Sequence, residues 1–328
     1  MPFIPSSVNT GNLKAYPQIA YDKLVVENWK ANTPALDLCD LRSMPKRAGR
    51  TNQYFGYIPF GPSTTKAAEG QTGAGLPLNQ VTAQTYLDQY VDYISYSDVA
   101  ESTFISPIVA EGAKELAYRG ALTVNTICTT AFDAATTQDS KTIIDLADNE
   151  FLASAIVRRC EFSLEALNVP RRADGMYGCM LSPLMAFDLM QDSTAGGITD
   201  TLKRFPQGAD MLQSGSKSYN VVDWAGIRLV RTTTVPTYAN FPSSGKTGYA
   251  MYVVGKEAFI ASSLYNEKLP RDKNFQVLVS YFQTATPDNP ALQVSAAVAF
   301  NFLFGVAARP NTNSAMGFRR VRGEVSIV

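Results

Sequence analysis

Residues 292–306 read LQVSAAVAFNFLFGV, in which apolar side chains alternate with small or polar ones. The apolar set is Leu292, Val294, Ala296, Val298, Phe300, Phe302, Phe304 and Val306. Strict alternation is typical of a β-strand, because successive side chains point to opposite faces. The stretch predicts a strand about 50 Å long, whereas average strands hold only about 5–6 residues. Residues 275–282, on the other side of a turn at 286–290, are its expected antiparallel partner.

A long helix is expected after Ser106-Pro107, an N-cap hydroxyl followed by proline at the first helical position. From Ile108 to Ala131, apolar and small residues recur on one helical face. Such a helix would be about 40 Å long. This helix and the long strand do not fit a compact globule, whose radius of gyration would be about 20 Å. The sequence therefore predicts an elongated, flattened α+β subunit.

A long hairpin is predicted before this helix. Residues 49–60 and 81–96 are expected strands, rich in aromatic and β-branched side chains, and neither face of 81–96 is purely apolar. The glycine-containing segment 61–80 between them exceeds the roughly 12–15 residues above which structureless loops tend to be functional or mobile. We interpret the three segments as a hairpin with a flexible tip that leans on other subunits.

The middle of the chain predicts a mixed α/β unit. A helix is expected over 145–168, because Asp145 and Asp148 at its start suit the helix dipole. A short buried strand at 175–181 should lead through a Ser-Pro cap into a helix at 184–191. Further strands are expected at 224–232 and 249–254. At the N-terminus, 1–45 is expected to be an arm that carries one short helix at 21–31.

Composition narrows the range of functions. Apolar residues make up 45% of the chain and charged residues 18%, against an average charged fraction of about 25%. Low charge suits a subunit that buries surface against neighbours, and equally a large, well-packed monomer. The net charge is zero, whereas proteins that grip phosphates carry a basic excess. No apolar run approaches the ~20 residues that span a bilayer, and no signal peptide is predicted.

The absence of histidine restricts the chemistry further. It excludes Ser-His-Asp and Cys-His catalysis and histidine-containing zinc sites. Cys39, Cys128, Cys160 and Cys179 lack CxxC spacing and are interpreted as reduced thiols, with Cys128 buried in the long helix. We predict no catalytic residue, no cofactor and no metal.

Two patterns resemble chemical sites and have simpler explanations. Residues 243–247 (SSGKT) end like a phosphate-binding loop, but Asn240 occupies the place of the first glycine, so a surface turn is expected. Asp88 and Asp92 would lie about 13 Å apart on one strand face. That separation exceeds the ~9.5 Å upper limit for the carboxylates of an inverting glycosidase.

Two other patterns could face nucleic acid. Tyr86, Tyr90, Tyr93 and Tyr96 could form a stacking platform for a single strand. Because they lack interleaved lysine or arginine, packing between subunits is the preferred interpretation. The basic run 319–322 (RRVR) is interpreted as part of a solvated tail, with nucleic-acid contact as the alternative.

The order of these elements resembles the HK97-like fold of tailed-bacteriophage (Caudoviricetes) major capsid proteins. Residues 180–189 (MLSPLMAFDL) are similar to that family's strand–Ser-Pro–helix element. Residues 224–230 (WAGIRLV), with Val235-Pro236, are similar to its turn and strand, and 253–259 (VVGKEAF) resemble the next strand and short helix. A further resemblance, to the coliphage-N4 type, comes from Glu69-Gly70, Asp88-Gln89-Tyr90 and Ser97-Asp98.

The resemblance covers about residues 45–310 and implies a division into five parts. These are an N-terminal arm (1–45), an E-loop hairpin (46–96), a spine helix of the P-domain (97–138), an A-domain (139–265), and P-domain strands with a C-terminal tail (266–328). The residues expected to contact neighbouring subunits are Trp29, Tyr54, Tyr57, Lys66, Glu69, Tyr86 and Tyr90. A covalent crosslink through Lys66 is not expected.

The function that the resemblance implies is that of a self-assembling major capsid protein of a virion, made in the cytoplasm of a bacterial host. Pentamers and hexamers would form an icosahedral shell around double-stranded DNA, with weak, non-specific DNA contact. A separate scaffolding protein is implied because no scaffold-like N-terminal extension is present, and a portal and optionally a cement protein would complete the partners. The alternatives are an encapsulin-type compartment, more remotely a histidine-free carboxylate-dependent glycosidase, and a tail or fibre protein.

Overall fold

A computed structural model of the protein describes residues 33–45, 47, 49–57, 60–64, 75–97, 108–135, 143–192, 221–264, 278–280, 295–309 and 317–326. Residues 96–97, 108–110, 221–222, 278–280 and 295–298 are described by their backbone alone. The helix predicted at 21–31 lies outside these ranges.

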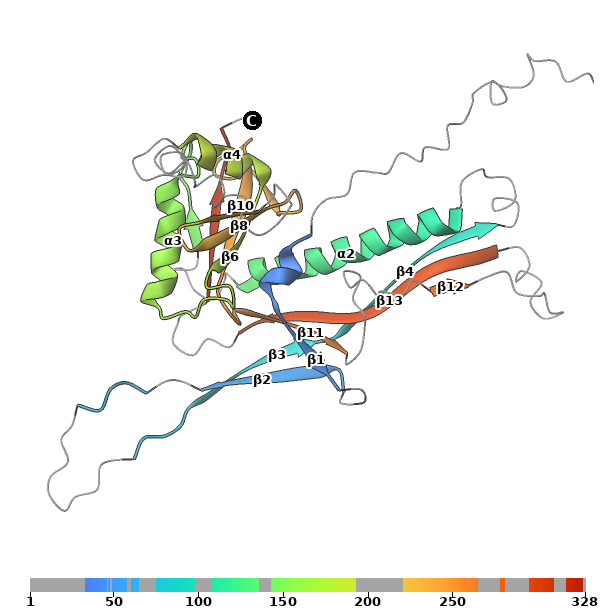
Figure 1. The fold of residues 1–328 in the computed structure, drawn as a ribbon, viewed down its shortest axis with the longest axis horizontal. Coiled ribbons are helices and arrows are strands. Elements are labelled where there is room, and N and C mark those ends of the chain that lie inside the picture. Colours follow the sequence, from blue (N-terminus) through green and yellow to red (C-terminus); the bar gives the residue numbers. More distant parts are fainter. Residues whose placement is uncertain are drawn as a thin grey trace, which may run out of the picture.

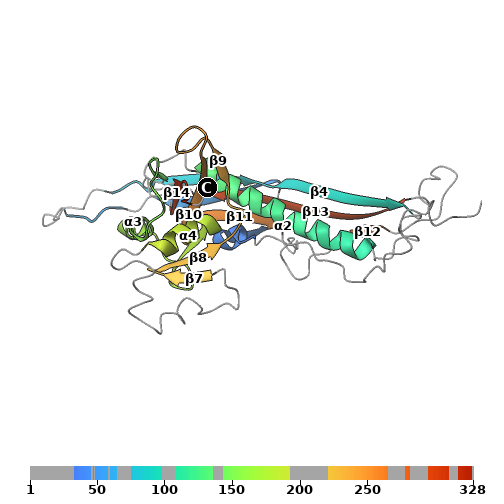
Figure 2. The same cartoon turned by 90° about the horizontal axis from the view of Figure 1, so that it is seen from above.

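A long helix and a long sheet form the extended part of the molecule. Helix α2 (Ile108–Ala135) lies along strand β13 (Ser295–Ala308), the longest strand, in both views (Figures 1 and 2). β13 pairs antiparallel with three strands, and a fourth, β1, adds in parallel to β11. These four are β1 (Asp40–Met44), β4 (Asp88–Ser97), β11 (Phe259–Leu264) and β12 (Leu278–Ser280). At the usual rise, β13 spans about 47 Å.

Alternation along β13 places its aromatic side chains against the helix. Phe300, Phe302 and Phe304 are buried in a core that also contains side chains of α2. Tyr90 of β4 is the register partner of Phe302 and stacks on it, with ring centroids 5.6 Å apart. The opposite face of the same strands carries side chains such as Asn301, which is exposed. We call this second surface the open face of the long sheet.

A separate two-stranded hairpin projects from one end of this sheet (Figure 1). It consists of β2 (Thr51–Tyr57) and β3 (Gln80–Tyr86), paired antiparallel with Thr51 opposite Tyr86. A single residue, Leu87, separates β3 from β4 and is 1% exposed. The chain therefore passes from the projecting hairpin into the long sheet at one buried residue.

A seven-stranded sheet with two helices forms the compact part of the molecule. Its strand order is β5-β14-β10-β6-β8-β7, and β9 pairs with β10. The strands are β5 (Ile143–Asp145), β6 (Tyr177–Leu181), β7 (Val221–Trp224), β8 (Ile227–Arg231), β9 (Thr237–Ala239), β10 (Thr247–Val254) and β14 (Phe318–Gly323). The helices are α3 (Ser154–Ala166) and α4 (Pro183–Gln191).

Alternate side chains of the strands divide the described interior into two cores. Cys179 and Leu181 of β6 face α3 and α4, whereas Met180 between them faces α2. The core on the α2 side continues along the long sheet and includes a short 3-10 helix, η1 (Ala35–Leu38). Truncating one large core residue typically lowers the free energy of unfolding by roughly 2–5 kcal/mol. The packing of these buried faces is therefore the main determinant of the fold.

Several predicted elements are confirmed. Helix α2 and strands β6 and β13 lie where the periodicity places them, and β12 is an antiparallel partner of β13. Ser182 caps α4 as expected, because its hydroxyl accepts from the Leu184 N–H at 3.3 Å. All four cysteines are free and buried, and burial raises the pKa of Cys160 to about 12.

Two predicted elements are wrong in their boundaries. The strand expected over 81–96 is divided at Leu87: its first half pairs in the hairpin and its second half with β13. The helix expected from Asp145 begins only at Ser154, because Ile143–Asp145 form strand β5, which pairs in parallel with β14. No helix within the described ranges is long and apolar enough to cross a membrane.

Candidate intersubunit surfaces

The outer face of the hairpin is exposed along both strands and carries no charge. Side chains at alternate positions of both strands share this face because their register partners point the same way. Its members are Thr51, Gln53, Phe55 and Tyr57 of β2 and Gln80, Thr82, Gln84 and Tyr86 of β3, all of them exposed. The aromatic rings of Phe55, Tyr57 and Tyr86 are 58%, 57% and 59% exposed. Exposed aromatic side chains on a projecting, uncharged strand pair are typical of a surface that packs against another protein.

Apolar side chains continue beyond the hairpin strands toward its tip. Phe60, Leu76 and Leu78 are each more than half exposed. A solvated loop tip would not need three large apolar side chains, because polar turn residues suffice there. Exposed apolar side chains therefore occur at several positions along the described length of the hairpin.

On β4 and β13, the open face of the long sheet carries a second group of exposed, uncharged side chains. Val91 and Tyr93 of β4 are 59% and 65% exposed, and Asn301 lies opposite Val91. The side-chain amide of Gln89, on the same face, donates to the side-chain Oδ1 of Asn301 at 3.0 Å. The opposite face of β4 carries charge instead, and there Arg119 of α2 pairs with Asp92 at 2.5 Å. The helix thus covers one face of the sheet, while the described residues of the other face remain exposed around Val91 and Tyr93.

The helices of the compact part expose a third group of apolar side chains, which the sequence analysis did not identify. Phe162 of α3 is 61% exposed, and Phe187 and Met190 of α4 are 40% and 42% exposed. Phe187 and Met190 lie three residues apart and so share one helical face. Helical periodicity alone could have flagged them, since Pro183, Phe187 and Met190 repeat at the spacing of a second apolar stripe.

The predicted contact residues fall into three groups. Tyr57 and Tyr86 lie on the exposed outer face of the hairpin. Tyr54 and Tyr90 are used within the subunit: the Tyr54 hydroxyl shares a hydrogen bond with Ser262, and Tyr90 stacks on Phe302. Trp29, Lys66 and Glu69 lie outside the described residues. A role between subunits stays a prediction for all seven.

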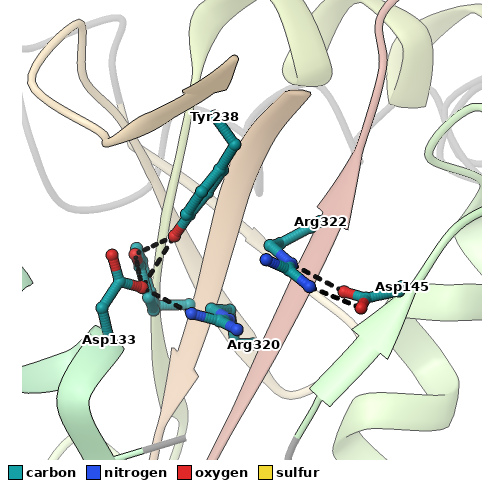
Figure 3. Close-up of polar contacts among 6 residues, drawn as sticks. Asp133, Asp145, Tyr238, Arg320 and Arg322 are labelled. Carbon is teal, nitrogen blue, oxygen red and sulfur yellow. Dashed lines mark hydrogen bonds and ion pairs between the residues drawn. The ribbon is translucent and has the colours of Figure 1, made fainter. Parts of the chain in front are cut away.

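A polar cluster joins the end of α2 to the seven-stranded sheet (Figure 3). One oxygen of Asp133 accepts from the hydroxyls of Tyr238 and Tyr252, both at 2.7 Å, and from Arg320 at 2.8 Å. Burial is the main cause that raises the pKa of both tyrosines, for Tyr238 to about 12. Both phenols therefore stay protonated at neutral pH and act as donors.

The basic run near the C-terminus belongs to this cluster, so its interpretation as a solvated tail is wrong. Arg319 and Arg320 are 4% and 6% exposed, because β14 lies between β10 and β5 inside the sheet. Arg322 makes two hydrogen bonds to Asp145, at 2.7 and 2.6 Å (Figure 3). The Tyr238 ring lies within 6 Å of the guanidinium carbons of both Arg320 and Arg322. Arg320 and Arg322 are paired with carboxylates inside the subunit and Arg319 is buried, which leaves this run little capacity to bind phosphate.

The residues considered for other chemistry are likewise paired. Lys246, in the turn that resembles a phosphate-binding loop, forms ion pairs with Asp148 and with Glu324 at 2.7 Å. Asp88 pairs with Arg50. Among the residues that the structure describes, no group of three or more Cys, Asp or Glu side chains is arranged to hold a metal ion.

Comparison with known proteins identifies the fold. No protein-family model and no curated protein matches the sequence. The structure is similar to the capsid of Ralstonia phage GP4 (TM-score 0.69, 12% identity, 98% of this chain and 99% of that chain). It is also similar to the cyanophage Pam1 capsid (0.69, 11%, 99% and 100%) and the head of Helicobacter pylori bacteriophage KHP40 (0.64, 10%, 98% and 100%). The chain has the α+β, HK97-like fold of phage capsid proteins over almost its whole length.

Proposed function

We propose that this chain is the major capsid protein of a tailed bacteriophage and that it assembles into a closed icosahedral shell. The observation that carries the proposal is the match of nearly the entire chain to phage capsid chains, with no large part left over on either side. At 10–15% identity the sequences share the arrangement of elements rather than particular residues. The fold-level match favours a shell over the glycosidase alternative.

The proposed mechanism of assembly is geometric. The hairpin reaches beyond the body of its own subunit (Figure 1), so its uncharged outer face is available to a neighbour. Contacts between unlike surfaces of identical copies are heterologous, and they close into rings when the rotation between copies permits it. In this proposal, rings of five and six subunits tile the shell. The division into arm, E-loop, P-domain and A-domain is part of the same proposal.

The contents of the shell would be double-stranded DNA held by weak, non-specific contact. The formal net charge is zero, with 29 basic and 29 acidic residues. Strong binding to DNA depends on many unpaired cations that release counterions from phosphates, and β14 uses its arginines internally. This charge balance agrees with a shell wall that encloses DNA without binding it tightly.

The finer assignments belong to the same proposal. The chain is proposed to be a structural subunit without catalytic activity. It would be made in the host cytoplasm and located in the virion. Its proposed partners are a portal and a separate scaffolding protein, with a cement protein as an optional addition. An encapsulin-type compartment is the alternative that shares the fold. The two differ in what the shell contains, which is DNA in one case and cargo protein in the other.

The decisive experiment measures particle formation and content. The recombinant protein is analysed by sedimentation velocity and negative-stain electron microscopy, with and without lysate from its source. Closed shells or rings of five and six subunits support the proposal, and nuclease-protected DNA in the particles separates a phage capsid from a cargo compartment. A stable monomer that never assembles, even with lysate present, contradicts it.

A further inference from the structure

The base of the hairpin sits on one defined position of the long sheet. Ser262 of β11 and Gly305 of β13 are register partners, so they lie side by side across the ladder. Ser262 is 0% exposed and its hydroxyl shares a hydrogen bond with Tyr54 of β2. We call Ser262 and Gly305 the hairpin seat. One strand of the hairpin is thus attached to the seat by a hydrogen bond.

The other strand of the hairpin, β3, contacts the seat at Gly305, which has no side chain. A Cβ atom at Gly305 would lie 2.1 Å from the carbonyl oxygen of Tyr86 and 2.9 Å from Cγ2 of Thr85. The first of these is a backbone atom, which a rotamer change cannot move. The end of β3 therefore crosses β13 in direct backbone contact, and Gly305 is the residue that permits the crossing.

After this crossing, the chain is held at a second position by hydrogen bonds between Leu87 and Arg50. The N–H of Leu87 donates to the Arg50 carbonyl oxygen at 2.9 Å, and the Arg50 guanidinium donates back to the Leu87 carbonyl oxygen at 2.7 Å. Arg50 also pairs with Asp88, the first residue of β4. With the Tyr54 bond and the Gly305 crossing, three separate contacts fix the direction in which the hairpin projects.

We propose that the hairpin seat, with Gly305 as its point of closest approach, sets the hairpin angle and, through it, the geometry at which neighbouring subunits join. Glycine here is required for space rather than for backbone conformation, because Gly305 lies within a regular strand. A side chain would lift the end of β3 from the sheet and rotate the outer face of the hairpin. In a ring closed by heterologous contacts, a change in the angle between copies accumulates around the ring and prevents closure. This inference rests on the proposed shell function.

The first test measures the hairpin angle in the dispersed subunit, independently of assembly. Spin labels are placed at Thr64→Cys near the tip and at Thr130→Cys on α2, both exposed positions, while the four native cysteines are buried. Gly305→Ala should displace the mean label-to-label distance by more than the width of the parental distribution. Gly112→Ala is the matched control, because its Cβ would meet only Ile94 at an ordinary 3.9 Å. An unchanged distance in Gly305→Ala would overturn the proposal.

The second test counts shells by electron microscopy under the conditions in which the parent assembles. Gly305→Ala should yield about tenfold fewer shells of the parental diameter, with open sheets or aberrant particles in their place, and Gly112→Ala should match the parent. Parental yield and diameter in Gly305→Ala contradict the inference. A parent that forms no shell contradicts the proposed function instead, while the distance measurement still decides the role of Gly305.

A second variant covers the case in which Gly305→Ala does not fold. Tyr54→Phe removes only the hydroxyl that bonds to Ser262 and leaves the ring in place. Because one of the three contacts is then lost, the label distance should broaden and the particle diameters should become heterogeneous. A parental distance width and diameter distribution in Tyr54→Phe would overturn the proposal.

Discussion

The guanidinium of Arg320, in the last strand of the described chain, donates to the carboxylate of Asp133 in the last turn of α2 at 2.8 Å. The two residues come from different layers: Asp133 ends the helix that lies along the long sheet, and Arg320 lies inside the seven-stranded sheet. The arginine side chain is 7% exposed and that of the aspartate 29%. This ion pair therefore holds the extended part of the molecule to the compact part at a site with limited access to water.

Asp133→Asn should destabilise the subunit strongly. The substitution keeps the size of the side chain but removes the negative charge that compensates the buried Arg320. Leaving one member of a buried ion pair without its partner costs several kcal/mol, and partial exposure of Asp133 reduces the expected loss to about 2–4 kcal/mol. Chemical denaturation of the dispersed subunit measures this loss. Asp148→Asn is the control, because Asp148 is 51% exposed and an ion pair in contact with water, such as its pair with Lys246, contributes little to stability. Equal losses in both variants would contradict the structural role of the buried pair.

Alkaline pH should weaken the same cluster through Tyr238. Burial raises the pKa of this phenol to about 12, whereas an unfolded tyrosine has a pKa of about 10. The folded state thus holds the proton more tightly, so the contribution to stability is complete below about pH 10 and is lost as pH rises toward 12. Unfolding free energies measured from pH 8 to 12 should fall across that window.

Tyr238→Phe isolates the contribution of this one group. The variant lacks the hydroxyl that donates to Asp133, so at pH 8 it should be less stable by about 1 kcal/mol. Because it has no phenol to ionise at this position, the stability difference from the parent should shrink between pH 10 and 12. Two stability curves that stay parallel over this window would rule out a titrating role for Tyr238.

Thr85→Val should stabilise the subunit by about 1 kcal/mol. Thr85 is 1% exposed at the base of the hairpin, and its hydroxyl oxygen has no hydrogen-bond partner within the described part of the chain. Valine has nearly the same shape and removes the unpaired polar group. Thr129→Val is the matched control of opposite sign, because the Thr129 hydroxyl is also buried but donates to the Thr126 carbonyl oxygen at 3.0 Å. Thermal unfolding of both variants checks the prediction, and a loss of stability in Thr85→Val would refute it.

Gly226→Ala should destabilise the turn between β7 and β8. Gly226 has a φ of +67°, and a Cβ there would lie 2.1 Å from Oε1 of Glu161, which pairs with Arg171. Left-handed backbone in alanine costs about 1–2 kcal/mol, and displacement of the ion pair adds to it. Gly175→Ala has a similar φ of +77° but open space around the Cβ, so it should show the backbone cost alone. A smaller loss of stability in Gly226→Ala than in Gly175→Ala would contradict the steric argument.

The elements that local patterns determine could be predicted from the sequence. The alternating run that includes Phe300, Phe302 and Phe304 is a strand because one face packs on α2 and the other does not. Ser182 followed by proline fixes the start of α4 through a hydrogen bond two residues away. Both signals lie within a few residues of the structure that they specify.

Elements that depend on distant partners could not be predicted in this way. Asp145 seemed to begin a helix, but it lies in strand β5, which pairs with β14, and its carboxylate binds Arg322 of that strand. The same pairing buries a basic run that appears solvated when its charges alone are considered. Leu87 interrupts a continuous aromatic stretch because β13 offers a partner only to the residues after it. In each case the deciding contact joins two strands whose residues are more than 170 positions apart in the sequence. Local spacing carries no information about such a contact.

Loss of the two hairpin aromatics, Phe55→Ser with Tyr57→Ser, should strongly weaken assembly while leaving the subunit folded. Both rings are exposed, at 58% and 57%, and surface substitutions of this kind usually change unfolding free energy by no more than about 0.5 kcal/mol. If these rings fill pockets on a neighbour, their removal costs about 2 kcal/mol or more each, since aromatic residues dominate interface energies. The concentration at which shells first appear in light scattering should then rise by more than about tenfold.

Gln53→Ser, on the same face but without an aromatic ring, is the control and should assemble at the parental concentration. Shells that form equally well without Phe55 and Tyr57 would show that the hairpin face is not the contact surface and would direct attention to the exposed rings of α3 and α4.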